Sequence, residues 1–432
     1  MISKIKNLKF FNFKLFFALC IMALFPAIYQ TIRTFILSTH VSVEAFDVLG
    51  QMEWFDLINE TLLAFLIIPF YSIFNKIFNH DQNNFSSFVF KFGTIATVLF
   101  AIFQCIVFCY ALQFIQFMNS DYVDIPTVLI YLRLETIAFI LGIIPNIAKV
   151  VFVVTKKSKN IYIFLIVQMA LTIIADFFMI PNFGVKGVAF SNMFINLVLS
   201  ITSILVLYLE KNIRWAKWRK EDIMVLKQYI KIGFFSGVQQ FIDNIVYALM
   251  IGKMVNMVAE QGNYWIANNF IWGWLLIPCS ALTEVIRSDC KDGYVAIKQE
   301  NYYFISLFVI ILWIITIPLW SLFYQNIERL ENAKTIFSIT LKLFPFYIAY
   351  ALCIIPDNIF IGLGKTKYNA INSAIINFIY YGIFYLLYKI GVLSFTMNTI
   401  ILMFGFGMVV HLLISWIEQY VFCKYERRTY IK

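Results

Sequence analysis

Two aspartates lie inside long apolar stretches of the chain. Asp243 is the single carboxylate between Ile230 and Ala248, and Asp357 directly follows Pro356 in a second apolar stretch. A charged side chain in membrane hydrocarbon costs roughly 2.5–3.5 kcal/mol on insertion scales. A chain that keeps such a residue usually uses it for an ion, a proton or a partner charge. The two carboxylates are therefore the first candidates for chemistry in this sequence.

Together, the two aspartates could form a cation site. Two carboxylates that face one dry cavity cannot both ionise cheaply, so one takes a proton or both share a cation. We expect Asp243 and Asp357 to bind Na⁺ or H⁺, and to be metal ligands if the ion is Na⁺. Amide oxygens of Gln239, Gln240 and Asn268 could complete such a site. The alternative is that each aspartate pairs with Lys or Arg in a packing role.

A second group of ionisable residues lies in the N-terminal half. We expect Arg33 and Asp176 to form an ion pair within the membrane. The acids of the second apolar segment, Glu53, Asp56 and Glu60, are rival partners for Arg33. Because Asp56 and Glu60 are four residues apart, they share a helix face, and an acidic face beside a cavity would suit cationic molecules.

Glu60 is the best candidate for such a contact, whereas Glu53 and Asp56 could instead lie at the outer rim of the membrane. Arg133 and Glu135 are too close in sequence to face each other. We expect one of them to line the cavity, or to pair across to the helix that carries Glu60.

The composition sets the class of protein. Hydrophobic residues make up 61% of the 432 residues and charged residues only 13%, against about a quarter in soluble domains. The net charge of +10 comes from Lys and Arg in short segments between apolar runs, which indicates cytoplasmic loops and a lipid-bilayer partner rather than nucleic acid. The seven cysteines are interpreted as packing residues, and the three histidines are scattered.

The apolar runs predict an all-α integral membrane protein with about twelve spanning helices. The basic segments fall on one side of the membrane if the helix count is even, so both termini should be cytoplasmic in a multi-pass protein of the cytoplasmic membrane. The spans are expected near 13–38, 50–76, 87–116, 123–154, 160–181, 186–209, 228–257, 262–286, 302–325, 336–362, 369–391 and 396–421.

The chain divides into two weakly similar halves. LFPAIYQTIRTF aligns with FFSGVQQFIDNI, which places Arg33 over Asp243, and GIIPNIAKV aligns with CIIPDNIFI at nearly the same offset. Internal repeats are frequent in transporters, with binding sites near the repeat interface. We expect an N-terminal six-helix lobe at 1–209, a cytoplasmic basic linker at 210–227 and a C-terminal six-helix lobe at 228–432.

Four segments carry a family resemblance. They are KIGFFSGVQQFID, IIPDNIFIGLGKTK, IIADFFMIPNFGVKGVAFSN and WIANNFIWGWLLIPCSALTEVIR. In their order and spacing, the chain resembles the MATE (multidrug and toxic compound extrusion) transporters, of the superfamily that also includes oligosaccharidyl-lipid and polysaccharide flippases. The resemblance implies two six-helix lobes around a central cavity. By the pattern of one branch of the family, Asp243 and Asp357 would bind the coupling ion. By the pattern of another branch, Asp176 would take part in ion binding. At the matching helix 1 position an acid is replaced by Arg33, which argues against a cation site in the N-terminal lobe.

The resemblance implies a transporter that exports cationic or neutral small organic molecules by alternating access, in antiport with Na⁺ or H⁺. We expect the protein to be a monomer and to need no cofactor beyond the coupling ion. The alternatives are a flippase for lipid-linked oligosaccharides or a related lipid, and a membrane scaffold that transports nothing. An enzyme is disfavoured, because GLGKT at 362–366 lacks the first glycine of a P-loop and no H-E-x-x-H motif occurs.

Overall fold

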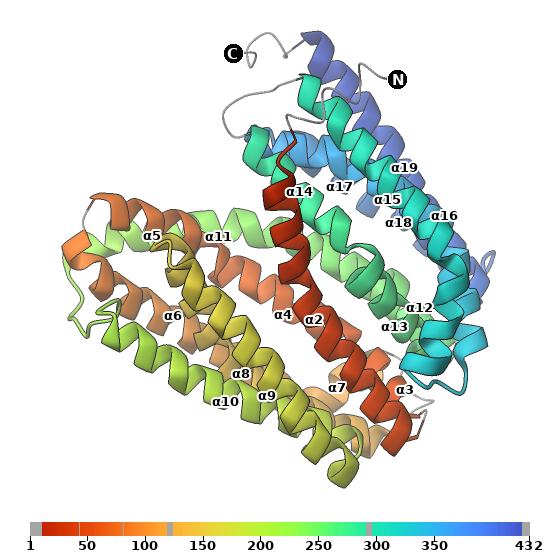
Figure 1. Ribbon diagram of the computed structural model, residues 1–432, viewed down its shortest axis with the longest axis horizontal. Coiled ribbons are helices and arrows are strands. Elements are labelled where there is room, and N and C mark those ends of the chain that lie inside the picture. The colour runs from red at the N-terminus through yellow and green to blue at the C-terminus, as the bar shows by residue number, and fades with distance from the viewer. Residues whose placement is uncertain (1–10, 43, 81, 119–123, 291–295, 426–432) are drawn as a thin grey trace. The chain divides into compact units, whose positions relative to one another are not determined.

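The computed structural model describes residues 11–42, 44–80, 82–118, 124–290 and 296–425, which form helices joined by short turns (Figure 1). Each predicted span has a helical counterpart in this part of the chain. The helices up to the middle of the chain are α2 (Phe13–His40), α3 (Glu44–Gln51), α4 (Glu53–Leu66), α5 (Ile68–His80), α6 (Gln82–Cys109), α7 (Ala111–Phe117), α8 (Ile125–Val154), α9 (Ser158–Phe183), α10 (Val185–Leu209), α11 (Lys220–Tyr247), η2 (Ala248–Gly252) and α12 (Lys253–Met257).

The second half of the chain is built in the same way, with several helices interrupted by π-helical turns. Its elements are α13 (Gln261–Phe270), η3 (Ile271–Leu275), α14 (Ile277–Cys290), α15 (Ala296–Leu322), η4 (Phe323–Ile327), α16 (Ala333–Gly362), α17 (Lys367–Ala374), η5 (Ile375–Tyr380), α18 (Tyr381–Lys389) and α19 (Met397–Tyr425).

Ten helices among the described residues are long and apolar enough to cross a membrane, and an eleventh span arises if the pair bent by 50° at Leu276 counts as one. The segment predicted at 228–257 is helical but is not among these candidates. Its apolar run is interrupted by polar residues at 239, 240, 243 and 244, which lower its hydropathy. A helix with this composition requires protein partners for its polar face.

The chain forms two compact units. Residues 32–262 form one, called here the N-unit, and residues 1–31 with 263–432 form the other, the C-unit. The boundaries differ from those of the lobes expected from the repeat, which remain a prediction. In particular, α11 belongs to the N-unit, where Tyr229 donates a hydrogen bond to the Leu66 carbonyl at 2.7 Å. Lys91 of α6 also contacts Asp222 of α11, with 2.7 Å between Nζ and Oδ2.

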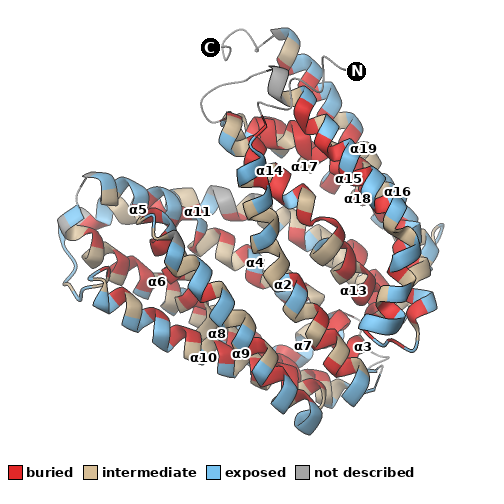
Figure 2. Cartoon of the chain, viewed as in Figure 1, coloured by how far each residue is buried: buried red, intermediate tan, exposed pale blue. Residues whose placement is uncertain are grey.

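Burial follows the membrane character of the helices. Within each unit the buried residues lie where helices meet, and many large apolar side chains are exposed on the outward faces (Figure 2). In the N-unit, the ring of Phe70 stacks on Phe74 and Tyr229, at centroid distances of 4.6 and 5.2 Å. Exposed apolar faces of this kind are expected where helices contact lipid tails.

At Gly187 the backbone of α10 lies close to the backbone of α9. A Cβ atom at this position would lie 2.3 Å from the backbone oxygen of Met179, which no side-chain rotation could relieve. The chain reaches this contact through Gly184, whose φ of +61° favours glycine. The G-x-x-G turn therefore fixes how the two helices pack.

We expect Gly187→Ala to destabilise the protein by about 1–3 kcal/mol, because the added methyl forces the two helix backbones apart. Thermal unfolding of the purified protein in detergent measures this effect. Gly252→Ala is the matched control, since a Cβ there meets nothing within 4 Å. Equal melting temperatures for the two variants would contradict the packing argument.

Glu328 follows η4 and lies outside the candidate spans, yet only 5% of its surface is exposed. Burial raises the pKa of Glu328 from its ordinary value of 4.5 to about 8. The folded state therefore keeps a proton on Glu328 that the unfolded chain releases at lower pH. The contribution of Glu328 to the free energy of unfolding is fully present below about pH 4.5. It is lost progressively as the pH rises from there to about 8.

We expect Glu328→Gln to remove this loss, so that its melting temperature exceeds that of the wild type most clearly at pH 8 and above. Melting temperatures between pH 5 and pH 9 test the prediction. Glu331→Gln changes an exposed acid in the same turn and should leave the pH profile unaltered. A profile for Glu328→Gln that parallels the wild type would show that this carboxyl is not responsible.

Candidate functional site

The polar centre of the N-unit is the predicted ion pair between α2 and α9. Arg33 Nε lies 2.7 Å from Asp176 Oδ2, and Arg33 Nη2 donates to Asp176 Oδ1 at 3.1 Å. The two side chains are 11% and 1% exposed. Two parallel hydrogen bonds between a guanidinium and a carboxylate form one of the stronger pairings available in a protein. The single positive charge of Arg33 is thus neutralised by Asp176.

Asn192 of α10 extends this pair to α8. It accepts a hydrogen bond from Arg33 Nη2 at 2.8 Å, and its Nδ2 donates to Glu135 Oε1 at 2.7 Å. Tyr131 also hydrogen-bonds to Glu135, which is buried. Glu135 is therefore held in the network through neutral partners. Its neighbour in sequence, Arg133, instead places its guanidinium 5.2 Å from the ring centroid of Phe108.

The acids of α4 lie next to this network. Asp56 and Glu60 are both exposed, and the charges that act on Asp56 are those of Glu135, Glu60 and Glu53. Neither Asp56 nor Glu60 makes an ion pair with any residue that the structure describes. We conclude that α4 presents an acidic face in a predicted membrane span, beside an Arg whose charge is already neutralised. Of the alternatives for Arg33, Asp176 is therefore its ion-pair partner, in place of the rival acids of α4.

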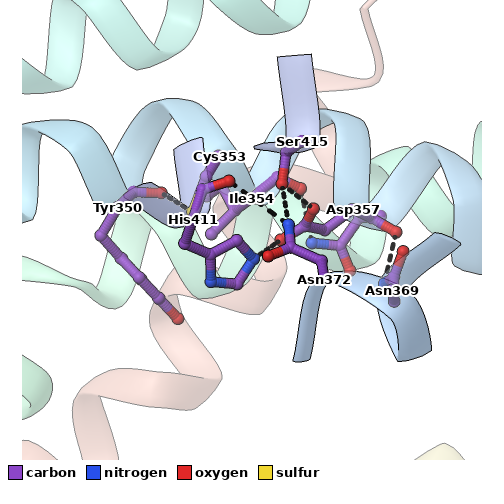
Figure 3. A network of polar contacts seen from close by, with 9 residues as sticks. Tyr350, Cys353, Ile354, Asp357, Asn369, Asn372, His411 and Ser415 are labelled. Atoms are coloured by element: carbon purple, nitrogen blue, oxygen red, sulfur yellow. Dashed lines mark hydrogen bonds and ion pairs between the residues drawn. The ribbon is translucent and has the colours of Figure 1, made fainter. Parts of the chain in front are cut away.

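Asp357 is the centre of a second polar cluster, in the C-unit (Figure 3). His411 Nε2 lies 2.9 Å from Asp357 Oδ2, and the Ser415 hydroxyl donates to Asp357 Oδ1 at 2.7 Å. Asn372 of α17 donates to the Ser415 oxygen at 2.8 Å and Asn369 donates to the Asp357 carbonyl at 3.1 Å. Three helices, α16, α17 and α19, thus converge on one carboxylate.

The partners of Asp357 differ from the expected Lys or Arg. His411 is one of three histidines scattered in the sequence, yet its ring lies against the Asp357 carboxylate. The missed signal is the spacing of His411 and Ser415, four residues apart and therefore on one helix face. The expected packing partner, Lys or Arg, is replaced here by His.

The predicted pair of Asp243 and Asp357 is divided between the two units, Asp243 in the N-unit and Asp357 in the C-unit. Their joint cation site stays a prediction. Gln240 donates to Asn244 at 2.9 Å, and Asn244 donates to the Leu57 carbonyl at 2.9 Å, so these amides join α11 to α4. The side chain of Gln239 lies outside the described residues. Asn268 accepts a hydrogen bond of 3.4 Å from the hydroxyl of Tyr347.

Comparison with known proteins gives matches by structure alone. No protein-family model and no curated protein matches the sequence. The chain is similar to a multidrug resistance transporter of the MATE family, MOP superfamily, in its inward-facing conformation. The TM-score is 0.74 and the sequence identity 15%, and the match covers 92% of this chain and 95% of that one. A MOP superfamily transporter from Pyrococcus furiosus, described as having a binding pocket of reverse polarity, has a TM-score of 0.65 and 14% identity over 96% and 97% of the chains.

A mutant of a MATE transporter from Vibrio cholerae is similar as well, with a TM-score of 0.65 and 11% identity over 98% of both chains. The matches cover nearly the whole of each chain, so the chain has the fold of the MATE transporters. The predicted fold class, an all-α membrane protein of this architecture, is confirmed.

We expect Asp176→Asn to destabilise the protein by about 3–5 kcal/mol, because Arg33 then remains buried without a counter-charge. Unfolding in detergent would report the change. The control is Glu210→Gln, which breaks a pair with Lys157 whose side chains are 37% and 24% exposed and should cost less than about 1 kcal/mol.

Removing both charges, in Arg33→Met with Asp176→Leu, should recover most of the stability that Asp176→Asn loses. If Asp176→Asn were tolerated as well as Glu210→Gln, the buried pair would not carry the stability assigned to it.

Proposed function

We propose that the protein is a secondary active transporter of the MATE family that exports cationic or neutral small organic molecules by alternating access, in exchange for Na⁺ or H⁺. The fold supports transport, since the structurally similar proteins are described as transporters. The acidic face of α4 supports a cationic substrate, and this observation carries the proposal.

The charge balance of the N-unit gives the physical reason. Arg33 and Asp176 cancel each other, and Asn192 and Tyr131 offer Glu135 only neutral hydrogen bonds. Asp56 and Glu60 then leave two acidic side chains without a counter-charge among the described residues, on an exposed face within a predicted span. Charge in such an environment acts at low dielectric, where a cation is attracted strongly and an anion is repelled. An organic cation is the ligand that this face favours.

Coupling requires a second site whose occupancy depends on an ion gradient. We assign this role to Asp243 and Asp357, each placed in a helix with polar neighbours. Because the cation changes the local charge, its binding would favour one orientation of the transporter over the other. In this proposal the protein acts as a monomer in the cytoplasmic membrane with both termini in the cytoplasm, and it catalyses no chemical reaction.

We expect the double variant Asp56→Asn with Glu60→Gln to export ethidium at least about tenfold more slowly than the wild type, because it loses charge contacts each worth on the order of 1.4 kcal/mol. Efflux from proteoliposomes of matched protein content measures this. Asp124→Asn, which neutralises an exposed acid at the start of α8, should transport normally. Unchanged efflux in the double variant would overturn the proposed substrate contact.

The coupling residues are tested in the same vesicles with separate Na⁺ and H⁺ gradients. Asp243→Asn and Asp357→Asn should each abolish gradient-driven accumulation while downhill flux of ethidium continues. Undiminished coupling in both variants would exclude this pair. Failure of the wild type to move any organic cation would exclude cations as the substrate and favour a flippase for lipid-linked oligosaccharides.

A further inference from the structure

The cluster around Asp357 contains two further metal-ligating groups, Cys353 and His411, that the proposed function does not use. Cys353 and Asp357 lie four residues apart on α16, and His411 faces them from α19. The Cys353 sulfur, an Asp357 oxygen and a His411 ring nitrogen all lie within 4.8 Å of one another. Ligand atoms around a tetrahedral ion lie roughly 3.5 Å apart, so small side-chain rotations would complete the geometry.

A fourth group points to the same ligand. Glu418 lies on α19 three residues beyond Ser415, on the helix face that carries His411, and the charges of Asp357 and His411 act on it. It is only 8% exposed, yet neither of its carboxylate oxygens has a hydrogen-bond partner among the described residues. The side-chain oxygen of Asn372, which hydrogen-bonds to Ser415 through its nitrogen, is likewise buried without a partner among the described residues. Buried acceptors without donors are costly, and a bound cation would satisfy them.

The donor set selects the kind of cation. One sulfur, one imidazole nitrogen and two carboxylates match the ligands of Zn²⁺ and neighbouring divalent transition metals, whereas Na⁺ and Mg²⁺ prefer oxygen alone. A dipositive ion would also offset two of the three negative charges that two carboxylates and a thiolate place in this partly buried position. His411 has a side chain 37% exposed, which gives the ion an entry route.

We propose that Cys353, Asp357 and His411, which are labelled in Figure 3, bind one divalent transition-metal ion of the Zn²⁺ class. In this proposal the Glu418 side chain turns toward the ion and becomes the fourth ligand. On binding, the Cys353 thiol loses its proton to solvent and gives up its weak hydrogen bond to the Tyr350 carbonyl, 3.2 Å long. Ser415 and Asn372 then hold the Asp357 carboxylate in position. The site shares Asp357 with the proposed coupling pair, but its metal binding is measured without any transport activity.

The competing explanation is a structural ion pair between Asp357 and His411 alone, with Cys353 as a packing residue. The two accounts differ in what they require of the sulfur. A metal site needs Cys353 as a thiolate ligand, whereas the ion pair is indifferent to replacement of sulfur by oxygen. Substitutions at Cys353 therefore separate the two accounts without altering the pair itself.

The test is Co²⁺ and Zn²⁺ binding to the purified full-length protein in detergent, where no ion gradient exists. The wild type should bind about one Co²⁺ with the absorption spectrum of a tetrahedral site and a sulfur-to-cobalt charge-transfer band. Cys353→Ser should lose the charge-transfer band, and His411→Gln should weaken Zn²⁺ binding by about 100-fold or more. Cys109→Ser and His40→Gln, which change residues outside the cluster, should behave as the wild type.

His411→Cys keeps a metal ligand at this position and should retain Zn²⁺ binding, which distinguishes lost ligation from a misfolded variant. The proposal is overturned if the wild type binds no Co²⁺, or if Cys353→Ser keeps the charge-transfer band. Because binding is measured at equilibrium, failure of this test leaves the transport proposal untouched, and failure of ethidium efflux leaves the metal site untouched.

Discussion

The low tolerance of membrane hydrocarbon for an unpaired charge governs the arrangement of polar residues in this protein. Arg33 illustrates it most directly, because its guanidinium is bonded to Asp176 and to Asn192 deep in the N-unit. Lys91 is buried in the same unit and is paired with Asp222. Because these buried cations are each paired with an acid, the acids that have no cationic partner in the described part of the chain are candidates for binding a ligand or an ion. They are concentrated on α4 in the N-unit and around Asp357 in the C-unit.

The two groups of acids have different surroundings, and this difference separates their roles. On α4, Asp56 and Glu60 are exposed, and the charges that act on Asp56 are those of other acids, which suits a ligand that binds reversibly. Asp357 is instead surrounded by side chains from three helices, including a thiol and an imidazole, which suits a small ion held by fixed ligands. The two groups also lie in different compact units, the acids of α4 in the N-unit and Asp357 in the C-unit.

Much of the fold could be predicted from the sequence, because apolar run length and basic loops follow directly from the bilayer. The Arg33–Asp176 pair could also be predicted, since a lone Arg in a span requires an acid. The partners of Asp357 could not, because His411 is remote in sequence and only tertiary packing brings α19 against α16. The placement of α11 in the N-unit was hidden as well, because its Asn244 and Tyr229 contacts with α4 depend on three-dimensional approach.

The central claim is that the acidic face of α4 selects cations, and equilibrium binding of fluorescent ligands to the purified protein tests it most directly. The account predicts saturable ethidium binding that weakens as salt rises and that is lost when Asp56 and Glu60 are both neutralised. An anionic dye of similar size should bind negligibly to the wild type. Tighter binding of the anionic dye than of ethidium, or ethidium binding that survives neutralisation of both acids, would contradict the account.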